Sequence, residues 1–262
     1  MKLFDTHAHC DDERIENEYK NGAEGLITDC LGANIGNIVN IGTNCKNSKR
    51  SVELAEKFDG VYAAVGIHPS DCQLIDYGTE RAISEIEELL SHPKVVAIGE
   101  IGLDYHYDDT DKERQLLYFR LQMELAKKHG MKVIIHDREA HGDCMEVVRQ
   151  FPEVKGIFHS FSGSAEMARE LCKMGWYVSF SGTVTFKNAS KPKEACVAVD
   201  EDKLLIETDS PYLPPVPHRG EMNIPSYVEF TAREIAGLRG ISFDEMARIT
   251  SENAKRIFGI KE

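Results

Sequence analysis

The stretch Lys-Val-Ile-Ile-His-Asp-Arg at residues 132–138 shows the pattern that decides the fold. A short run of mostly β-branched residues, typical of a buried strand, ends in a polar residue, His136. The segment before it carries Leu117, Leu121 and Leu125 four positions apart, which predicts an amphipathic helix. Helices that alternate with buried strands predict a parallel sheet.

The same unit recurs along the whole chain. Eight apolar runs predict strands: Leu3–Asp5, Ile38–Ile41, Val61–Ile67, Val95–Ile98, Lys132–Ile135, Gly156–Phe158, Tyr177–Phe180 and Leu204–Ile206. Eight such units in 262 residues predict an α/β fold, a (β/α)8 TIM barrel that spans residues 1–262 as a single domain. The unit after Tyr177 is the weakest, because its helix over 191–199 is short and contains Pro192. A distorted or seven-stranded barrel therefore stays open, and a doubly wound open sheet is the main rival.

Two serines near the end of the chain indicate where the last helices begin. Ser226 with Glu229, and Ser242 with Glu245, have the spacing of capping boxes. They predict helices over 226–238 and 242–258.

Composition places the chain among ordinary globular proteins, with 42% hydrophobic and 29% charged residues. No apolar run approaches the roughly 18 to 20 residues of a membrane helix, and no signal-peptide region opens the chain. We therefore expect a soluble, cytoplasmic protein with no membrane partner. The seven cysteines lack zinc-ribbon spacing, which favours reduced structural thiols.

The net charge of −13 argues against a broad basic surface that wraps nucleic acid. It does not exclude a small site in which metal ions supply the positive charge. Two divalent ions would change −13 to −9, with most of the gain at the site itself.

Polar side chains at the ends of the predicted strands point to a metal centre. The first strand continues into Asp5, His7 and His9, which share one face because strands have a two-residue period. Histidine is the commonest metal ligand, and Asp5 is a candidate to orient one of the rings. A lone His-x-His pair is a weak signal for a metal site, so the interpretation depends on the residues at the other strand ends.

Five further polar residues end later strands: His68, Glu100, His136, His159 and Asp209. In a barrel these ends share one rim, where active sites are built. Six ligands, His7, His9, Glu100, His136, His159 and Asp209, exceed what one zinc ion takes from protein, so two divalent ions are expected. A water shared by two ions is deprotonated near neutral pH, and the resulting hydroxide attacks a phosphoryl or carbonyl centre. Asp209 is the natural general base.

Seven motifs follow one another along the chain: His-Ala-His at 7–9, Gly-Ile-His-Pro at 66–69, Gly-Glu-Ile-Gly-Leu-Asp-Tyr at 99–105, Ile-His-Asp-Arg at 135–138, His-Ser-Phe-Ser-Gly at 159–163, Glu-Thr-Asp-Ser-Pro-Tyr-Leu at 207–213, and Arg219-Gly220 with Asn223 and Pro225. In this order they resemble the motifs of the TatD family of metal-dependent deoxyribonucleases, within the amidohydrolase superfamily. The resemblance implies a distorted TIM barrel and covers the chain from end to end.

The resemblance also implies roles for individual residues. His7, His9, Glu100 and Asp209 would surround one metal, and Glu100, His136 and His159 the other, with Glu100 as the bridge. His68, Arg138 and Arg219 would approach the substrate phosphate, and His68 would also act in catalysis. An ion pair of Arg138 with Asp137 or Glu139 is the alternative for that arginine.

The metal itself is less determined than the site. The resemblance implies Mg²⁺ for activity, whereas four imidazoles suit Zn²⁺, Mn²⁺, Fe or Ni better. We expect a transition metal in the isolated protein, with Mg²⁺ sustaining turnover in a weaker site.

The leading function is hydrolysis of DNA phosphodiester bonds, as a 3′ to 5′ exonuclease on single-stranded ends. Tyr105, Tyr107, Phe161 or Phe186 could stack a base, but ordinary packing is the better explanation of each. The alternative keeps the metals and changes the substrate to an amide or ester, such as that of a D-aminoacyl-tRNA. His218, Arg219 and the lysines at 187, 191 and 193 favour phosphate, and a non-enzymatic metal-binding scaffold is a third class.

Overall fold

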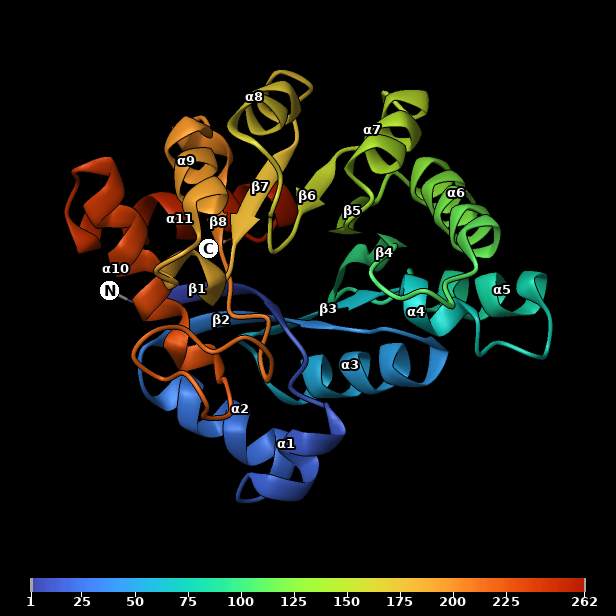
Figure 1. The fold of residues 1–262 in the computed structure, drawn as a ribbon. Helices are drawn as coiled ribbons and strands as arrows, with labels where there is room; N and C mark the ends of the chain where they lie inside the picture. The colour runs from blue at the N-terminus through green and yellow to red at the C-terminus, as the bar shows by residue number, and fades with distance from the viewer. Residues whose placement is uncertain (1, 262) are drawn as a thin grey trace. The chain divides into compact units, whose positions relative to one another are not determined.

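The computed structural model describes residues 2–261 and contains eight strands. They are β1 (Leu3–Ala8), β2 (Ile35–Ile41), β3 (Val61–Val65), β4 (Val95–Asp104), β5 (Lys132–Arg138), β6 (Gly156–Phe158), β7 (Tyr177–Phe180) and β8 (Leu204–Ile206) (Figure 1). The strands follow one another in chain order, and those whose register is defined pair in parallel. A doubly wound sheet would reverse its strand order at a switch point, so this order excludes that rival.

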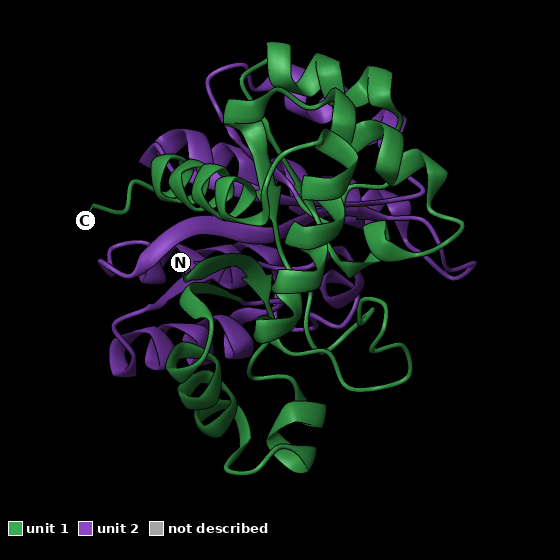
Figure 2. Cartoon of the chain, turned by 90° about the vertical axis from the view of Figure 1, so that its left-hand side faces the viewer, with its two compact units in different colours: residues 1–40, 159–262 green, residues 41–158 purple. Residues whose placement is uncertain are grey.

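The chain divides into two compact units, residues 1–40 with 159–262 and residues 41–158 (Figure 2). The first unit holds α1 (Glu13–Glu18), α2 (Gly22–Gly32), α8 (Ala165–Lys173), α9 (Ser190–Ala198), α10 (Val228–Arg239), α11 (Phe243–Phe258) and the short 3-10 turns η1 (Gly182–Thr185), η2 (Glu201–Lys203) and η3 (Pro225–Tyr227). The second holds α3 (Cys45–Lys57), α4 (Pro69–Cys72), α5 (Thr79–Leu89), α6 (Lys112–His129) and α7 (His141–Gln150).

Apolar side chains of strands and helices form the core of each unit. In the first unit α11 packs against β1 and β8, and the ring of Phe4 stacks on that of Phe258 with centroids 6.1 Å apart. In the second, α3 packs against β3 and α6 against β4. Burying each such large apolar side chain stabilises the fold by roughly 1.5–3 kcal/mol relative to exposure. None of the helices within residues 2–261 is long and apolar enough to cross a membrane.

The observed strand bounds correct several of the predicted ones. β1 extends to Ala8 rather than Asp5, β2 begins at Ile35 rather than Ile38, and β3 ends at Val65 rather than Ile67. β4 continues past Glu100 to Asp104, and β5 continues past His136 to Arg138. The pairing of these two strands is irregular between Ile98 and Ile101, which lets β4 carry Glu100 and still extend. Glu100 and His136 therefore lie within strands rather than just after them.

The two predicted capping boxes differ in outcome. Ser242 caps α11 and accepts a hydrogen bond from the backbone N–H of Glu245, as predicted. The prediction for Ser226 is wrong, because Pro225 opens the 3-10 turn η3 and α10 begins only at Val228. Glu229 instead accepts a hydrogen bond from Asn34 Nδ2 at 3.0 Å.

The weak unit after Tyr177 is helical but short, as expected. Its helix α9 has only nine residues and contains Pro192 in the first turn, where a missing N–H costs little. The seven cysteines are buried free thiols, in agreement with the structural role predicted for them.

Candidate metal centre

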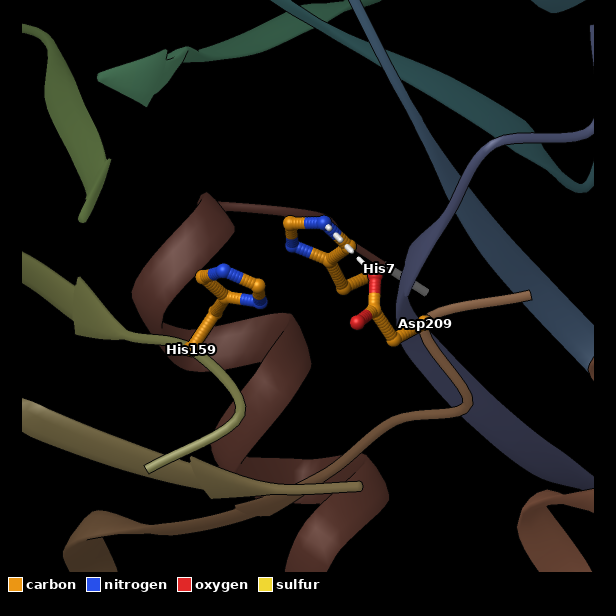
Figure 3. A group of neighbouring side chains, drawn as sticks. All are labelled: His7, His159 and Asp209. Atoms are coloured by element: carbon orange, nitrogen blue, oxygen red, sulfur yellow. Dashed lines mark ion pairs between the residues drawn. The ribbon is translucent and has the colours of Figure 1, made fainter. Parts of the chain in front are cut away.

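The first unit brings His7, His9 and Asp209 together. The Nε2 atoms of His7 and His9 lie 3.2 Å apart, and Asp209 Oδ1 lies 3.7 Å from the former and 3.5 Å from the latter. The His7 side chain is fully buried, and those of His9 and Asp209 are 10% and 13% exposed. Figure 3 shows the Asp209 carboxylate directed at the ring of His7, with His159 beside them. Because strand β1 alternates its faces, its sequence alone places His7 and His9 on the same side.

These distances fit a metal ion. Ligands about 2.0–2.2 Å from a tetrahedral ion lie roughly 3.3–3.6 Å from one another. The three distances among the two imidazole nitrogens and the carboxylate oxygen span 3.2–3.7 Å. A buried carboxylate that faces two ring nitrogens is also the donor set that a divalent cation neutralises.

The backbone at Asp209 is strained in a way that aims its carboxylate. Asp209 follows β8 with φ of 59°, a region that residues with a Cβ rarely adopt. Its N–H donates to the carbonyl of His7 at 2.9 Å, which holds it against β1. Burial raises the pKa of the Asp209 carboxyl, but the hydrogen bond from His9 and the neighbouring imidazoles outweigh burial and lower it. The side chain is therefore an ionised acceptor at neutral pH.

His159 joins the same group, and a residue that the sequence analysis overlooked orients it. The His159 ring lies parallel to that of His7, with centroids 4.0 Å apart. Its Nδ1 lies 3.2 Å from Oε1 of Glu207, a fully buried carboxylate that also accepts from the backbone of Ser160 at 2.7 Å. A carboxylate only accepts, so Nδ1 carries the hydrogen and the Nε2 lone pair is available to a metal. The two-residue spacing of Glu207 and Asp209 was the available signal.

Asp5 links strand β1 to the segment that follows β8. Its carboxylate accepts hydrogen bonds from the Thr208 backbone at 2.9 Å, from the Thr208 hydroxyl at 2.5 Å and from the His7 backbone at 3.3 Å. Complete burial raises the pKa of Asp5 to about 8. These contacts hold β1 beside the segment that carries Asp209, whereas from the sequence Asp5 was one candidate to orient an imidazole ring.

The second unit holds a group made of His68, Glu100 and His136. Glu100 Oε1 lies 2.7 Å from His136 Nδ1 and 3.7 Å from His68 Nε2. Glu100 is 2% exposed, so its charge requires partners. One ligand atom of each residue lies within 4.8 Å of the others, which is compatible with a metal ion.

His68 differs from the other histidines because it also begins a helix. Its Nδ1 accepts a hydrogen bond of 3.1 Å from the backbone N–H of Ser70 at the start of α4. In the neutral ring the hydrogen then sits on Nε2, which makes that nitrogen a donor. A nitrogen that carries a hydrogen can donate to a substrate oxygen but cannot bind a metal. This tautomer of His68 therefore suits a substrate-binding role more than a metal-binding one.

Asp104 is a second residue that the sequence analysis did not select. Its Oδ2 lies 3.1 Å from His136 Nε2, and its Oδ1 accepts from the backbone of His106 at 3.0 Å. Burial opposes its ionisation, but the hydrogen bonds from His136 and His106 lower the pKa of Asp104. Accepting from Nε2 leaves Nδ1 of His136 as the ligand atom. Asp104 shares a face of β4 with Glu100, a periodicity that could have identified it.

The two predicted phosphate-binding arginines each lie over an aromatic ring. Arg138 is half-exposed, 3.9 Å from Asp104 and 5.5 Å from the centroid of Tyr107. Arg219 stacks 4.1 Å from the ring centroid of Phe186. The alternative partners of Arg138 are engaged elsewhere, Asp137 by His141 and Glu139 by His106.

Among the other predicted phosphate contacts, His218 pairs with Glu221 and stacks on Tyr227, and Lys193 pairs with Glu234. Each of the six predicted ligands falls in one of the two groups, four in the first unit and two in the second.

The chain matches known proteins along nearly its whole length. The family model described as "TatD related DNase" covers residues 4–259. The protein named as the uncharacterized metal-dependent hydrolase YabD of Bacillus subtilis (strain 168) is 47% identical over 260 residues, 98% of this chain and 99% of that protein. The one named YcfH, from Escherichia coli K12, is 33% identical over 262 residues, 99% of this chain and 97% of that protein.

A solved structure agrees with the sequence matches. The TatD homologue YJJV from Escherichia coli K12 superposes with a TM-score of 0.90 at 29% identity, over 99% of this chain and 98% of that one. This likeness confirms the predicted (β/α)8 fold of eight parallel strands with helices between them. The family match and the names of these relatives, together with donor groups that fit metal ions, lead to one conclusion: the chain belongs to the TatD family and is a metal-dependent hydrolase.

Proposed function

We propose that the protein hydrolyses phosphodiester bonds of DNA and removes nucleotides from the 3′ end of single strands. The observation that carries this proposal is the ionised Asp209 carboxylate, buried and 3.5 Å and 3.7 Å from two imidazole nitrogens. Such a group can bind a metal through one oxygen and take a proton through the other. The family description, which names a DNase, supports DNA as the substrate class.

The ligand assignment implied by the family resemblance is part of the proposal. His7, His9 and Asp209 would hold one ion, His136 and His159 the other, and Glu100 would be shared. Bound divalent ions lower the pKa of water and offset the charge of the phosphoryl group. We propose transition metals in the isolated protein, because four of the six ligands are imidazoles.

The chain's own groups divide the reaction between them. Asp209 accepts one proton of the attacking water, while the remaining OH joins phosphorus and the bond to the 3′ oxygen of the preceding nucleotide breaks. That oxygen receives the proton, so the products are a 5′-mononucleotide and a strand one residue shorter. His68 donates from Nε2 to a phosphoryl oxygen, a role that its contact with Ser70 supports.

Arg138 and Arg219 bind the phosphates in this proposal. A guanidinium offers two parallel donors that match phosphate oxygens, and its stacking on a ring limits the orientations it can take. A net charge of −13 argues against a long basic surface along which DNA would bind. A small phosphate-binding site is sufficient for the end of a single strand.

The test is degradation of a 5′-labelled single-stranded oligonucleotide by metal-stripped protein with Mg²⁺, Mn²⁺ or Zn²⁺ added singly. We expect a ladder that shortens from the 3′ end and a loss of at least about 100-fold in rate for Asp209→Asn. The matched control is Asp29→Asn, which changes an aspartate that accepts from Tyr19 on the surface of the same unit. Hydrolysis of aminoacyl esters with no cleavage of DNA under any metal would replace the proposal with the ester alternative.

A further inference from the structure

Tyr212 is an exposed aromatic residue whose backbone N–H, backbone carbonyl and side-chain hydroxyl are all hydrogen-bonded. It follows Asp209 by three residues, and its N–H donates to the Asp209 carbonyl at 2.9 Å. Its own carbonyl accepts from Asn223 Nδ2 at 2.6 Å, and its hydroxyl donates to Asp12 Oδ2 at 2.6 Å. Ordering an exposed side chain costs conformational entropy, and these hydrogen bonds offset part of that cost.

Asn223 explains how the loop keeps its shape. It is completely buried and donates to the carbonyls of both Thr208 and Tyr212, which joins the two sides of the loop. Leu213 adopts φ of 46°, a conformation that costs energy for a leucine. The loop is thus built to present particular side chains rather than left to adjust.

The ring of Tyr212 lies beside the first group of metal ligands. It meets the ring of His9 edge-on, with centroids 5.9 Å apart and planes at 69°. Half of the Tyr212 side chain remains exposed, at 51%. An aromatic face that is rigid, accessible and adjacent to the ligands can receive a flat apolar group of the substrate.

The residues that follow in the loop offer the two chemistries that a nucleotide needs. Leu213 and Val216 are 43% and 46% exposed and add apolar surface to the same loop. Arg219, later in the same loop, supplies a cation that is stacked on Phe186. The Val216 N–H donates to the Thr185 hydroxyl at 2.8 Å, so the turn η1 supports this part of the loop. Apolar surface suits a base, and the guanidinium suits a phosphate.

Three of the aromatic residues named in the sequence analysis fit a stacking role less well. Phe161 is only 3% exposed, and Phe186 already lies under the Arg219 guanidinium. Tyr105 donates its hydroxyl to Asp143 and lies 4.2 Å from the Lys112 ammonium, which occupies the ring.

We propose that the ring of Tyr212 stacks the nucleobase of the terminal nucleotide, with Asp12 holding the ring in the receiving orientation. The proposal rests on the DNA hydrolysis proposed above and specifies how the substrate is recognised. Stacking on an aromatic ring tolerates any base, so trimming would depend on the presence of a base and little on its identity.

The experiment compares two oligonucleotides that differ only in whether the terminal 3′ nucleotide carries a base or is abasic. The measured quantity is the ratio of kcat/KM for the base-bearing strand to that for the abasic strand. Tyr212→Ala should lower this ratio about tenfold, mainly through KM, since one stack contributes a factor of about 5 to 150 in binding. Tyr212→Trp, which keeps a stacking face, should restore the ratio.

Tyr19→Ala is the matched control. Tyr19 also donates its hydroxyl to an aspartate, Asp29, but it lies at the end of α1 and outside the loop of Tyr212. The ratio of kcat/KM values measured for Tyr19→Ala should equal that of the parent protein. If the parent cleaves both strands and Tyr212→Ala leaves the ratio unchanged, the stacking role is wrong and the nuclease function stands. If the parent cleaves neither strand, the proposed function falls, and the stacking role falls with it.

Discussion

At the scale of single residues, the carboxylates behind the histidines decide how well the metal ligands are oriented. Glu207 is fully buried and accepts from His159 and Ser160 through Oε1, while its Oε2 has no hydrogen-bond partner within residues 2–261. Burying a carboxylate with one oxygen that has no hydrogen-bond partner is costly. A carboxylate behind His159 makes the ring a stronger ligand for a cation, which gives Glu207 a function that offsets this cost.

Glu207→Gln should weaken metal binding about 10- to 100-fold while the fold is retained, because the amide oxygen can still accept both hydrogen bonds but carries no charge. Titration of metal-stripped protein with Mn²⁺ or Zn²⁺ against a competing chelator measures the affinity. Glu229→Gln is the control, since Glu229 accepts from Asn34 and Arg233 and lies in neither ligand group. If Glu207→Gln binds the metal as tightly as the parent protein, Glu207 has only a structural role.

At the scale of elements, the pairing of β4 with β5 positions the second ligand group. Gly102 faces His136 in the register of these strands and adopts φ of +137°. A Cβ at this position would lie 2.1 Å from the His136 carbonyl oxygen, a clash with backbone that cannot rotate away. The glycine is therefore required for the approach that carries Glu100, Asp104 and His136.

Gly102→Ala should destabilise the protein by about 2–4 kcal/mol, because the strain and the clash add. Gly142→Ala in α7 is the control, since no atom lies within 4 Å of a Cβ there and alanine favours a helix by up to about 1 kcal/mol. Urea unfolding followed by circular dichroism compares the two variants. Equal stabilities would show that β4 and β5 can separate locally without cost.

The elements also show what can be predicted from sequence and what cannot. The periodicity of apolar runs predicts all eight strands, and strand alternation places His7 beside His9, because both are local properties. The irregular pairing that extends β4 to Asp104 depends on β5, and no local pattern reveals it. The hydroxyl of Tyr212 meets Asp12, 200 positions earlier in the chain, so its fixed orientation also needed the structure. Ser226 failed as a cap because the neighbouring Pro225 favoured a different turn.

At the scale of the whole molecule, bound cations link folding to metal supply. The chain carries a net charge of −13, and the ligand groups keep carboxylates such as Glu100 and Asp209 away from water. Cations that bind only the folded state stabilise it by about 2.7 kcal/mol at a concentration 100 times Kd. For a chain of this size, that corresponds to a rise of about 5 °C or more in Tm.

We expect Mn²⁺ or Zn²⁺ to raise the Tm of metal-stripped protein at lower concentrations than Mg²⁺, because imidazole nitrogen binds them more tightly. Thermal unfolding with each ion gives the ranking, and elemental analysis of the reconstituted protein gives the count. The parent should retain two ions per chain and His136→Ala one, whereas His92→Ala, which changes a surface histidine paired with Glu56, should retain two. Retention of magnesium alone would overturn the preference for transition metals. A single ion in the parent would overturn the binuclear assignment, because one of the two ligand groups would then keep its buried carboxylate without a cation.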